Sequence, residues 1–211
     1  MAEQRILARR VRVAPLRRAP VLVAGCDMSS ERFGKVLHCG VVVVRLPDLE
    51  TVASAAISVP ARFPYVPGLL SFREAPGILE ALSRLDVRPD VLVLDGHGLA
   101  HPRRFGIACH VGLAAGLPSL GCAKSILTGT HARLGPERGA TADLVQGTQV
   151  VGRALRTKDH VNPVYVSIGT GLTLDDAVAI CLATDWGLRI PEPTRRAHML
   201  VNEVRRATRK D

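Results

Sequence analysis

Residues 91–102, VLVLDGHGLAHP, constrain the fold of this chain more than any other stretch. Four apolar β-formers lead directly into Asp95, and Gly96 and Gly98 follow. A short, wholly apolar run is typical of a strand buried on both faces, and Pro102 suits the first turn of a helix. The order of strand, acid, glycine turn and helix predicts an α/β unit with Asp95 where open α/β sheets bind ligands. An aspartate that only caps the turn is the other interpretation.

The remaining apolar runs predict a mixed chain of strands and helices. Strands are expected at residues 20–26, 36–46, 51–59, 91–94, 118–123, 149–155 and 161–168. Helices are expected with Pro76 in a first turn, over 102–116, from Thr173 and from Pro191. Residues 28–34 are expected to turn, 62–68 to form a rigid proline loop, and 128–148 to form an irregular, glycine-rich excursion.

The order of these elements predicts a ribonuclease-H-like fold. Three antiparallel strands come first and parallel α/β units follow, so we expect an α/β fold with a mixed central sheet and helices on both faces. In that plan the first and fourth strands are neighbours. Asp27 follows the first strand and Asp95 follows the fourth, so the two carboxylates are expected side by side.

Length and composition favour one packed domain. The chain has 211 residues and is 47% hydrophobic, which is enough for a sizeable core. We interpret residues 1–211 as a single domain, with a basic N-terminal arm over 1–18 and a catalytic core over 19–205. The five cysteines show no C-x-x-C spacing, and no apolar run reaches the length of a membrane span. These features predict a reduced, cytoplasmic protein with no membrane partner.

The charge of the chain favours a nucleic-acid partner. The formal net charge is +9, and both ends are rich in arginine. Two solvated basic ends are the plainer interpretation of the same pattern. Aromatic residues make up only 3% of the chain, which argues against a module that stacks many bases on a platform of rings.

Acidic residues at the ends of elements predict a metal site. Two neighbouring carboxylates raise each other's pKa unless a hard cation removes the repulsion, and Mg²⁺ accepts such ligands together with phosphate oxygens. Glu74, just before a helical segment, is a third candidate ligand beside Asp27 and Asp95. Such a triad with one or two ions can activate water for phosphodiester cleavage. Each acid taken alone could instead cap a turn or a helix.

Four further residues are candidates for a nucleic-acid site. Lys124 follows a buried strand and can hold a phosphate, and His198 lies beside the last helical stripe, where it can position water. Both could equally be ordinary exposed or structural side chains. Tyr65, in the stiff loop, can wedge into a base stack or simply pack that loop onto the body. His101 is weaker, because it could merely cap its helix.

Five segments resemble the motifs of endonuclease V, in the order of that family. They are AGCD at 24–27, PYVPGLLSFREAP at 64–76, DVLVLDGHGLAHP at 90–102, GCAKS at 121–125 and RIPEPTR at 189–195. The likeness runs from about residue 20 to about residue 205. It therefore covers nearly the whole chain, and the strings together are highly specific.

The resemblance implies an activity. It implies a ribonuclease-H-like, Mg²⁺-dependent endonuclease for which Mn²⁺ is expected to substitute. The substrate would be DNA containing deaminated bases, chiefly hypoxanthine. The strand would be cut on the 3′ side of the lesion, at the second phosphodiester bond, in DNA repair. The protein is expected to act as a monomer.

The resemblance also implies roles for single residues. The metal ligands would be Asp27 and Asp95, with Glu74 as a third acid of the site. Lys124 and His198 would complete the catalytic group. The contacts to nucleic acid would come from the wedge Tyr65, from Gly68 and Leu69 in the base pocket, and from Pro67, Gly96 and His101.

The sequence departs from the usual family pattern in three places. Position 97 is His where Gln is common, and residues 167–172 lack the Pro and His often found there. Residues 28–30, Met-Ser-Ser, follow Asp27 where the family frequently has an apolar or aromatic residue. None of these departures touches a proposed metal ligand, so they bear on lesion preference and strand grip and not on the reaction class. Three alternatives stay open: an endoribonuclease for inosine-containing RNA, a non-catalytic nucleic-acid-binding protein of the same fold, and another nuclease of that fold. The loop around Tyr65 argues against the third, and the presence of all three acids argues against the second.

Overall fold

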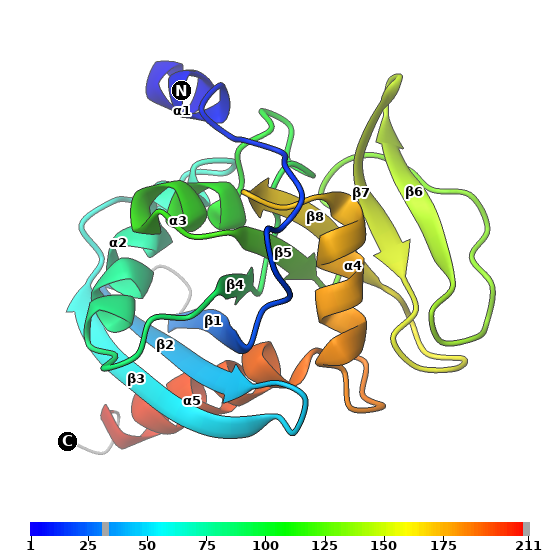
Figure 1. Ribbon diagram of the computed structural model, residues 1–211. Coiled ribbons are helices and arrows are strands. Elements are labelled where there is room, and N and C mark those ends of the chain that lie inside the picture. The colour runs from blue at the N-terminus through cyan, green and yellow to red at the C-terminus, as the bar shows by residue number, and fades with distance from the viewer. Residues whose placement is uncertain (31–33, 209–211) are drawn as a thin grey trace.

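The computed structural model describes residues 1–30 and 34–208, in which eight strands form one mixed sheet (Figure 1). The strands are β1 (Leu22–Ser30), β2 (Val36–Arg45), β3 (Glu50–Pro60), β4 (Val91–Leu94), β5 (Ser119–Ala123), β6 (Thr141–Gln146), β7 (Gln149–Leu155) and β8 (Val164–Thr170). Their order across the sheet is β3-β2-β1-β4-β5-β8-β7-β6. The α/β fold class is confirmed, and so is the neighbouring position of the first and fourth strands.

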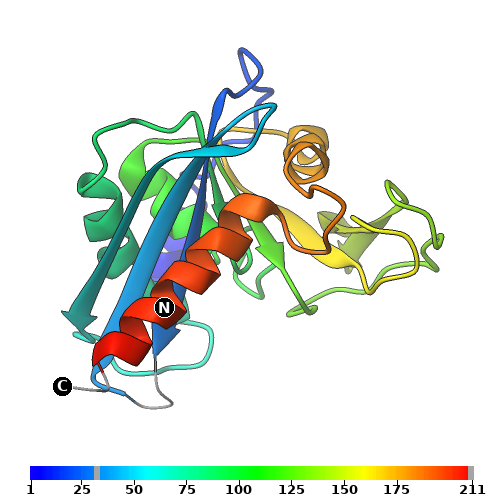
Figure 2. The same cartoon turned by 90° about the horizontal axis from the view of Figure 1, so that it is seen from below.

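Helices cover both faces of this sheet, as predicted. They are α2 (Leu70–Ser83), α3 (Ile107–Ala115), α4 (Leu174–Ala183) and α5 (Glu192–Thr208), preceded by the short N-terminal helix α1 (Ala2–Ala8). Helices α2 and α3 bury Ile78 and Val111 in a core on one face, whereas α4 and α5 bury Ile180 and Ala197 in a core on the other. Figure 2 shows α5 lying along the first strands of the sheet. Every helix in residues 1–30 and 34–208 is too short or too polar to cross a membrane.

The structure corrects two predicted helix starts. Helix α2 begins at Leu70, so Pro76 lies inside it rather than in its first turn, and Glu74 lies within the helix rather than before it. A proline inside a helix costs about 3 kcal/mol, but the apolar face of α2 is buried on the sheet and offsets this cost. Helix α3 begins at Ile107 and not at Pro102, because Arg104 adopts a left-handed conformation with φ 55°. The loop before α2 is therefore shorter than predicted, and the loop before α3 is longer.

The structure also corrects three predictions about strands. Residues 28–30 continue β1 instead of turning, and residues 31–33 lie outside the described residues. The excursion at 128–148 contains β6, which pairs antiparallel with β7. Parallel pairing is confined to β1–β4 and β4–β5, since β8 runs antiparallel to β5 and β7. The helix predicted from Thr173 is confirmed as α4, and it begins with a capping box in which the Thr173 and Asp176 side chains each bond the other's backbone N–H.

Candidate active site

Strand register brings Asp27 and Asp95 together. Strands β1 and β4 are parallel, Cys26 pairs with Leu94, and the backbone N–H of Asp95 donates to the carbonyl of Cys26 over 3.1 Å. The two aspartates are the next residues along each strand, so both carboxylates emerge at the same edge of the sheet. Asp95 follows the carboxyl end of β4, whereas Asp27 lies inside β1, at the point where its parallel pairing with β4 ends. The carboxyl ends of parallel strands are where α/β sheets place their chemistry.

Two glycines let α5 approach this edge and deliver His198. A Cβ on Gly25 would lie 2.0 Å from the Pro193 carbonyl carbon, and one on Gly40 would lie 2.6 Å from a Val201 methyl carbon. Asp27 is two residues beyond Gly25 on β1, and it faces Gly40 on β2. Five residues of helix and two of strand each advance about 7 Å, so His198 arrives opposite Asp27. Its Nδ1 lies 2.7 Å from an Asp27 carboxylate oxygen.

Lys124 reaches the same edge from β5. Its ammonium group donates a hydrogen bond to the Asp95 carboxylate and forms an ion pair with it. The Arg189 guanidinium donates to the Lys124 carbonyl over 2.9 Å and also to Pro163 over 3.0 Å. Arg189 therefore fixes the end of β5 against the loop before α5. Both residues belong to segments that carried the family resemblance.

Glu74 approaches the two aspartates from α2. It lines a cavity together with Asp95, and burial together with the negative charge of Asp27 raises the pKa of Glu74 to about 8. Burial, followed by the charge of Asp95, also raises the pKa of Asp27. Both shifts have the same cause: a poorly hydrated place and neighbouring carboxylates disfavour the charged form of each acid. Glu74 is therefore close enough to sense the charges of both aspartates, but the ligand atoms that lie within 4.8 Å of one another belong to Asp27, Asp95 and His198.

The donor set of Asp27, Asp95 and His198 fits a hard divalent cation. Asp27, Asp95 and His198 each offer one ligand atom, and these atoms lie within 4.8 Å of one another. Carboxylate oxygens are the protein ligands that Mg²⁺ prefers, and a cation would relieve the repulsion that raises the two pKa values. His198 already bonds Asp27, so it can orient that carboxylate toward a cation in the way second ligand shells do.

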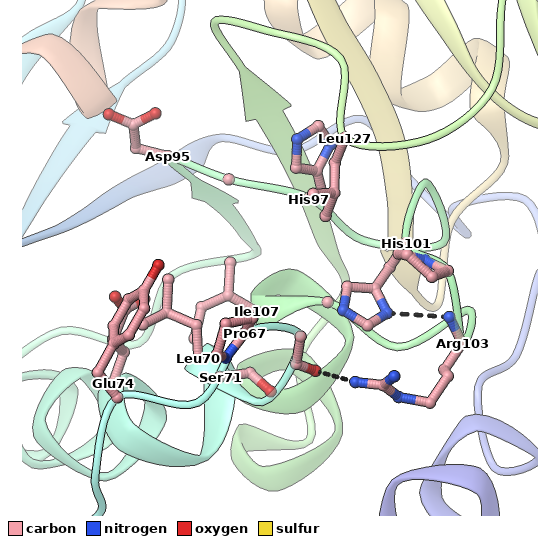
Figure 3. A pocket seen from close by; sticks show the side chains of 15 residues that line it. Pro67, Leu70, Ser71, Glu74, Asp95, His97, His101, Arg103, Ile107 and Leu127 are labelled. Atoms are coloured by element: carbon pink, nitrogen blue, oxygen red, sulfur yellow. Dashed lines mark hydrogen bonds between the residues drawn. The ribbon is translucent and has the colours of Figure 1, made fainter. Parts of the chain in front are cut away.

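A cavity of about 490 Å³ opens directly beside the acids. Figure 3 shows Asp95 and Glu74 at one end of this cavity and His101 and Arg103 at the other. One wall comes from the loop before α2 and the first turns of that helix. The other wall comes from the turns between β4 and α3, and Leu127 completes the lining. A volume of this order suits one small planar ligand such as a nucleobase.

Most of the residues predicted to contact nucleic acid line this cavity. The ones that do so are Tyr65, Pro67, Gly68, Gly96 and His101. Leu69 does not appear among the lining residues; it precedes the first residue of α2, and Leu70 takes its place on the wall. Tyr65 is 54% exposed at the mouth, so its ring is accessible to a ligand. His101 is buried and does not cap a helix, since α3 begins six residues later.

Two cavity residues were missed by sequence reasoning. The Ser71 hydroxyl and the Nδ1 atom of His97 are buried, and neither finds a hydrogen-bond partner within residues 1–30 and 34–208. Burial lowers the pKa of His97, so its ring is neutral at pH 7 and can accept or donate a hydrogen bond. His97 could have been found from the sequence, because it departs from the Gln that is common at this position in the family. No pattern singled out Ser71, because its position depends on where α2 begins.

Comparison with known proteins adds the family. The endonuclease V family model matches residues 5–199. The chain is 53% identical over 185 residues to endonuclease V of Myxococcus xanthus, an alignment that covers 88% of this chain and 79% of that protein. It is 44% identical to endonuclease V of Roseiflexus castenholzii, which covers 97% of this chain and 93% of the relative.

Solved structures agree with these sequence matches. The crystal structure of endonuclease V from Streptomyces avermitilis superposes with a TM-score of 0.94 and 42% identity, covering 98% of this chain and 92% of that one. Endonuclease V of Ciona intestinalis, in complex with a 23mer DNA containing an inosine followed by a ribo-adenosine, gives a TM-score of 0.82 and 25% identity, with coverage of 96% and 93%. The chain therefore belongs to the endonuclease V family of nucleases.

Proposed function

We propose that this protein is a divalent-cation-dependent endonuclease that cuts a DNA strand near a deaminated base, with hypoxanthine as the main target. One observation carries the proposal: Glu74 and Asp95 belong both to the acidic group and to the wall of the 490 Å³ cavity. A base held in that cavity keeps its own strand beside the acids. The Ciona relative bound to inosine-containing DNA supports this class of ligand. We expect cleavage at the second phosphodiester bond 3′ of the lesion.

Asp27, Asp95 and Glu74 would hold the cation, with Mg²⁺ as the expected ion and Mn²⁺ as a substitute. A divalent cation at such a site supplies a positive charge that activates water and stabilises the leaving oxygen. The three acids would come from β1, the end of β4 and α2. Asp27 is buried, and Asp95 and Glu74 are partly buried, which strengthens the interaction of each carboxylate with a cation.

Lys124 and His198 act on either side of the acids. Lys124 forms an ion pair with Asp95, so its ammonium group can turn to a phosphate oxygen once a cation neutralises that aspartate. His198 bonds Asp27 through Nδ1, while its Nε2 lies 3.0 Å from the Asn202 amide. This geometry fixes the imidazole, and His198 would orient water near the phosphate once its Nε2 exchanges the Asn202 amide for that water. We place the activity in cytoplasmic DNA repair, because deamination damages bases in chromosomal DNA.

Cleavage of a labelled DNA duplex with one deoxyinosine tests the proposal. With Mg²⁺ we expect one nick at the second bond 3′ of the lesion, and none in a matched duplex that carries deoxyadenosine instead. Addition of a chelator should stop the reaction. Equal cutting of both duplexes, or unchanged cutting without a divalent cation, would refute it.

Inosine-containing RNA is the second candidate substrate. The DNA in the Ciona complex contains a ribo-adenosine directly after its inosine, so that family member accepts a ribonucleotide next to the lesion. An RNA strand of the same sequence, with one inosine, should be assayed beside the DNA. A higher kcat/KM on the RNA would identify this protein as an endoribonuclease.

Tyr65→Ala should weaken binding to a deoxyinosine duplex by roughly 1–3 kcal/mol, the usual loss for one stacking contact. Tyr65 is half-exposed at the mouth of the cavity, on a loop with Pro67. Its ring can therefore fill the stack that an extruded base leaves. A single strand has no paired stack to invade, so its affinity should fall less. The measurement is the affinity of wild type, Tyr65→Ala and the ring-retaining Tyr65→Phe for the deoxyinosine duplex and for the single strand. An equal loss on both substrates would exclude a wedge.

A further inference from the structure

The two walls of the cavity are joined by one buried side chain from the N-terminal helix. Gln4 is 0% exposed although its neighbours on α1 are mostly exposed. Its amide nitrogen donates to the Gly68 carbonyl over 3.1 Å and to the Phe105 carbonyl over 3.0 Å. Gly68 belongs to the wall before α2, and Phe105 lies in the turn that forms the wall before α3. Gln4 thus ties together two segments that are distant in the sequence.

Arg103 completes this connection. Its Nε donates to the Gln4 amide oxygen, and another guanidinium nitrogen donates to the Gly68 carbonyl. The Gly68 carbonyl therefore accepts from both Gln4 and Arg103. Gly68 has φ 76°, and a Cβ there would lie 2.4 Å from the Arg103 guanidinium. Only glycine suits this position, because it tolerates the left-handed backbone and leaves room for Arg103.

We propose that Gln4 is a positioning residue for lesion recognition, acting as a latch with Arg103 that sets the separation of the two cavity walls. The inference rests on the proposed function, because the cavity is taken as the site of the extruded base. Both the oxygen and the nitrogen of the Gln4 side-chain amide form hydrogen bonds in this network, and these bonds hold α1 against the two walls. The N-terminal arm then contributes to selectivity through Gln4 as well as to affinity through its arginines.

The physical basis is the cost of leaving buried polar groups unpaired. Replacing Gln4 by an apolar side chain of similar size keeps the packing but removes both donors and the acceptor. The carbonyls of Gly68 and Phe105 lose a buried donor, and Arg103 loses an acceptor. The two walls can then move apart at lower cost, and a base in the cavity makes poorer contacts. The acids at the other end of the cavity keep all of their own partners.

Gln4→Met is the variant that tests the latch, with Arg5→Ala as its control on the exposed side of the same helix. On a deoxyinosine duplex we expect Gln4→Met to raise KM about tenfold, which corresponds to about 1.4 kcal/mol, with kcat changed less than about twofold. Binding to the undamaged duplex should stay as in wild type. Arg5→Ala should lower the affinity for both duplexes by the same factor, and only at low salt.

Hydrogen–deuterium exchange gives a readout that needs no substrate. In Gln4→Met, amides of residues 66–72 and 103–108 should exchange faster than in wild type, while those of β1 and β4 stay unchanged. The latch would be overturned if Gln4→Met left both hydrogen exchange and KM unchanged. It would also be overturned if Gln4→Met lowered the affinity for damaged and undamaged duplexes equally. If wild type fails to cut deoxyinosine, the proposed function falls while the exchange data still decide on the latch. Should Gln4→Met fail to fold, Arg103→Lys must show the same pattern.

Discussion

Asp95→Asn should lower the rate of cleavage in Mg²⁺ by more than about a hundredfold. Loss of a residue that only supports a metal ligand costs about 10–100-fold, and Asp95 would be a ligand itself. Asparagine keeps the size of the side chain but removes the charge that attracts the cation. It also leaves Lys124 without its carboxylate partner, so the ammonium group no longer has a fixed position near the phosphate.

The fold should survive this change. Asp27 and Asp95 repel each other, and this repulsion contributes to the raised pKa of Asp27. Removing one charge relieves that repulsion, so the cation-free variant should melt no lower than wild type. The matched control is Asp175→Asn, an exposed residue paired with Arg153 and remote from the acids. Single-turnover cleavage of the deoxyinosine duplex is the measurement, and an Asp95→Asn protein with wild-type rates would exclude a metal role for this residue.

Without divalent cations, the protein should lose stability as pH rises from about 4.5 to about 8. The pKa of Glu74 is raised from 4.5 to about 8 in the folded protein. Between these values the folded state keeps a proton that the unfolded state has released, so stability falls as pH increases. One pKa unit corresponds to about 1.4 kcal/mol, and the full loss is roughly 3–5 kcal/mol. Asp27 contributes in the same direction, because its pKa is also raised.

Thermal unfolding at a series of pH values, with chelator or with Mg²⁺, measures this effect. We expect a fall in Tm on the order of 10 °C in chelator, and Mg²⁺ should reverse the fall at pH 8 because it binds only the folded acids. Glu74→Gln should flatten the pH dependence. Its control is Glu80→Gln, an exposed glutamate on the same helix that pairs with Arg84. A Tm that rises with pH in chelator would contradict the burial of Glu74 near Asp27.

Sequence patterns predicted the strands of the core well, because a strand that is buried on both faces needs a continuous run of apolar residues. Strand β4 is wholly apolar, and residues 22–26 of β1 and 41–44 of β2 are unbroken runs of Gly and apolar residues. Strand β6 was not predicted, because half of its residues are polar and Leu144 alone is fully buried. It is a strand through its pairing with β7, and cross-strand pairing leaves no local signal.

Helix starts were predicted less well, because tertiary contacts decided them. Packing of α2 on the sheet carries the helix through Pro76. At α3, the left-handed Arg104 donates hydrogen bonds to Gln146 and Gln149 on the distant β6 and β7. Neither contact is visible in the residues next to the helix start. These two shifts moved Glu74 into α2 and kept His101 away from a helix cap.

The sequence by itself determined the fold class and the neighbouring positions of Asp27 and Asp95, since apolar runs dictate strands and their order indicates neighbours. Its motifs, through their resemblance to endonuclease V, indicated the family. Only the tertiary structure decided which polar groups are buried together. Glu74 has a raised pKa because α2 packs over the acids, and Gln4, in a basic arm that read as solvated, is fully buried against two carbonyls more than 60 residues away. Desolvation and hydrogen-bond partners depend on three-dimensional proximity, and no local pattern of residues encodes them.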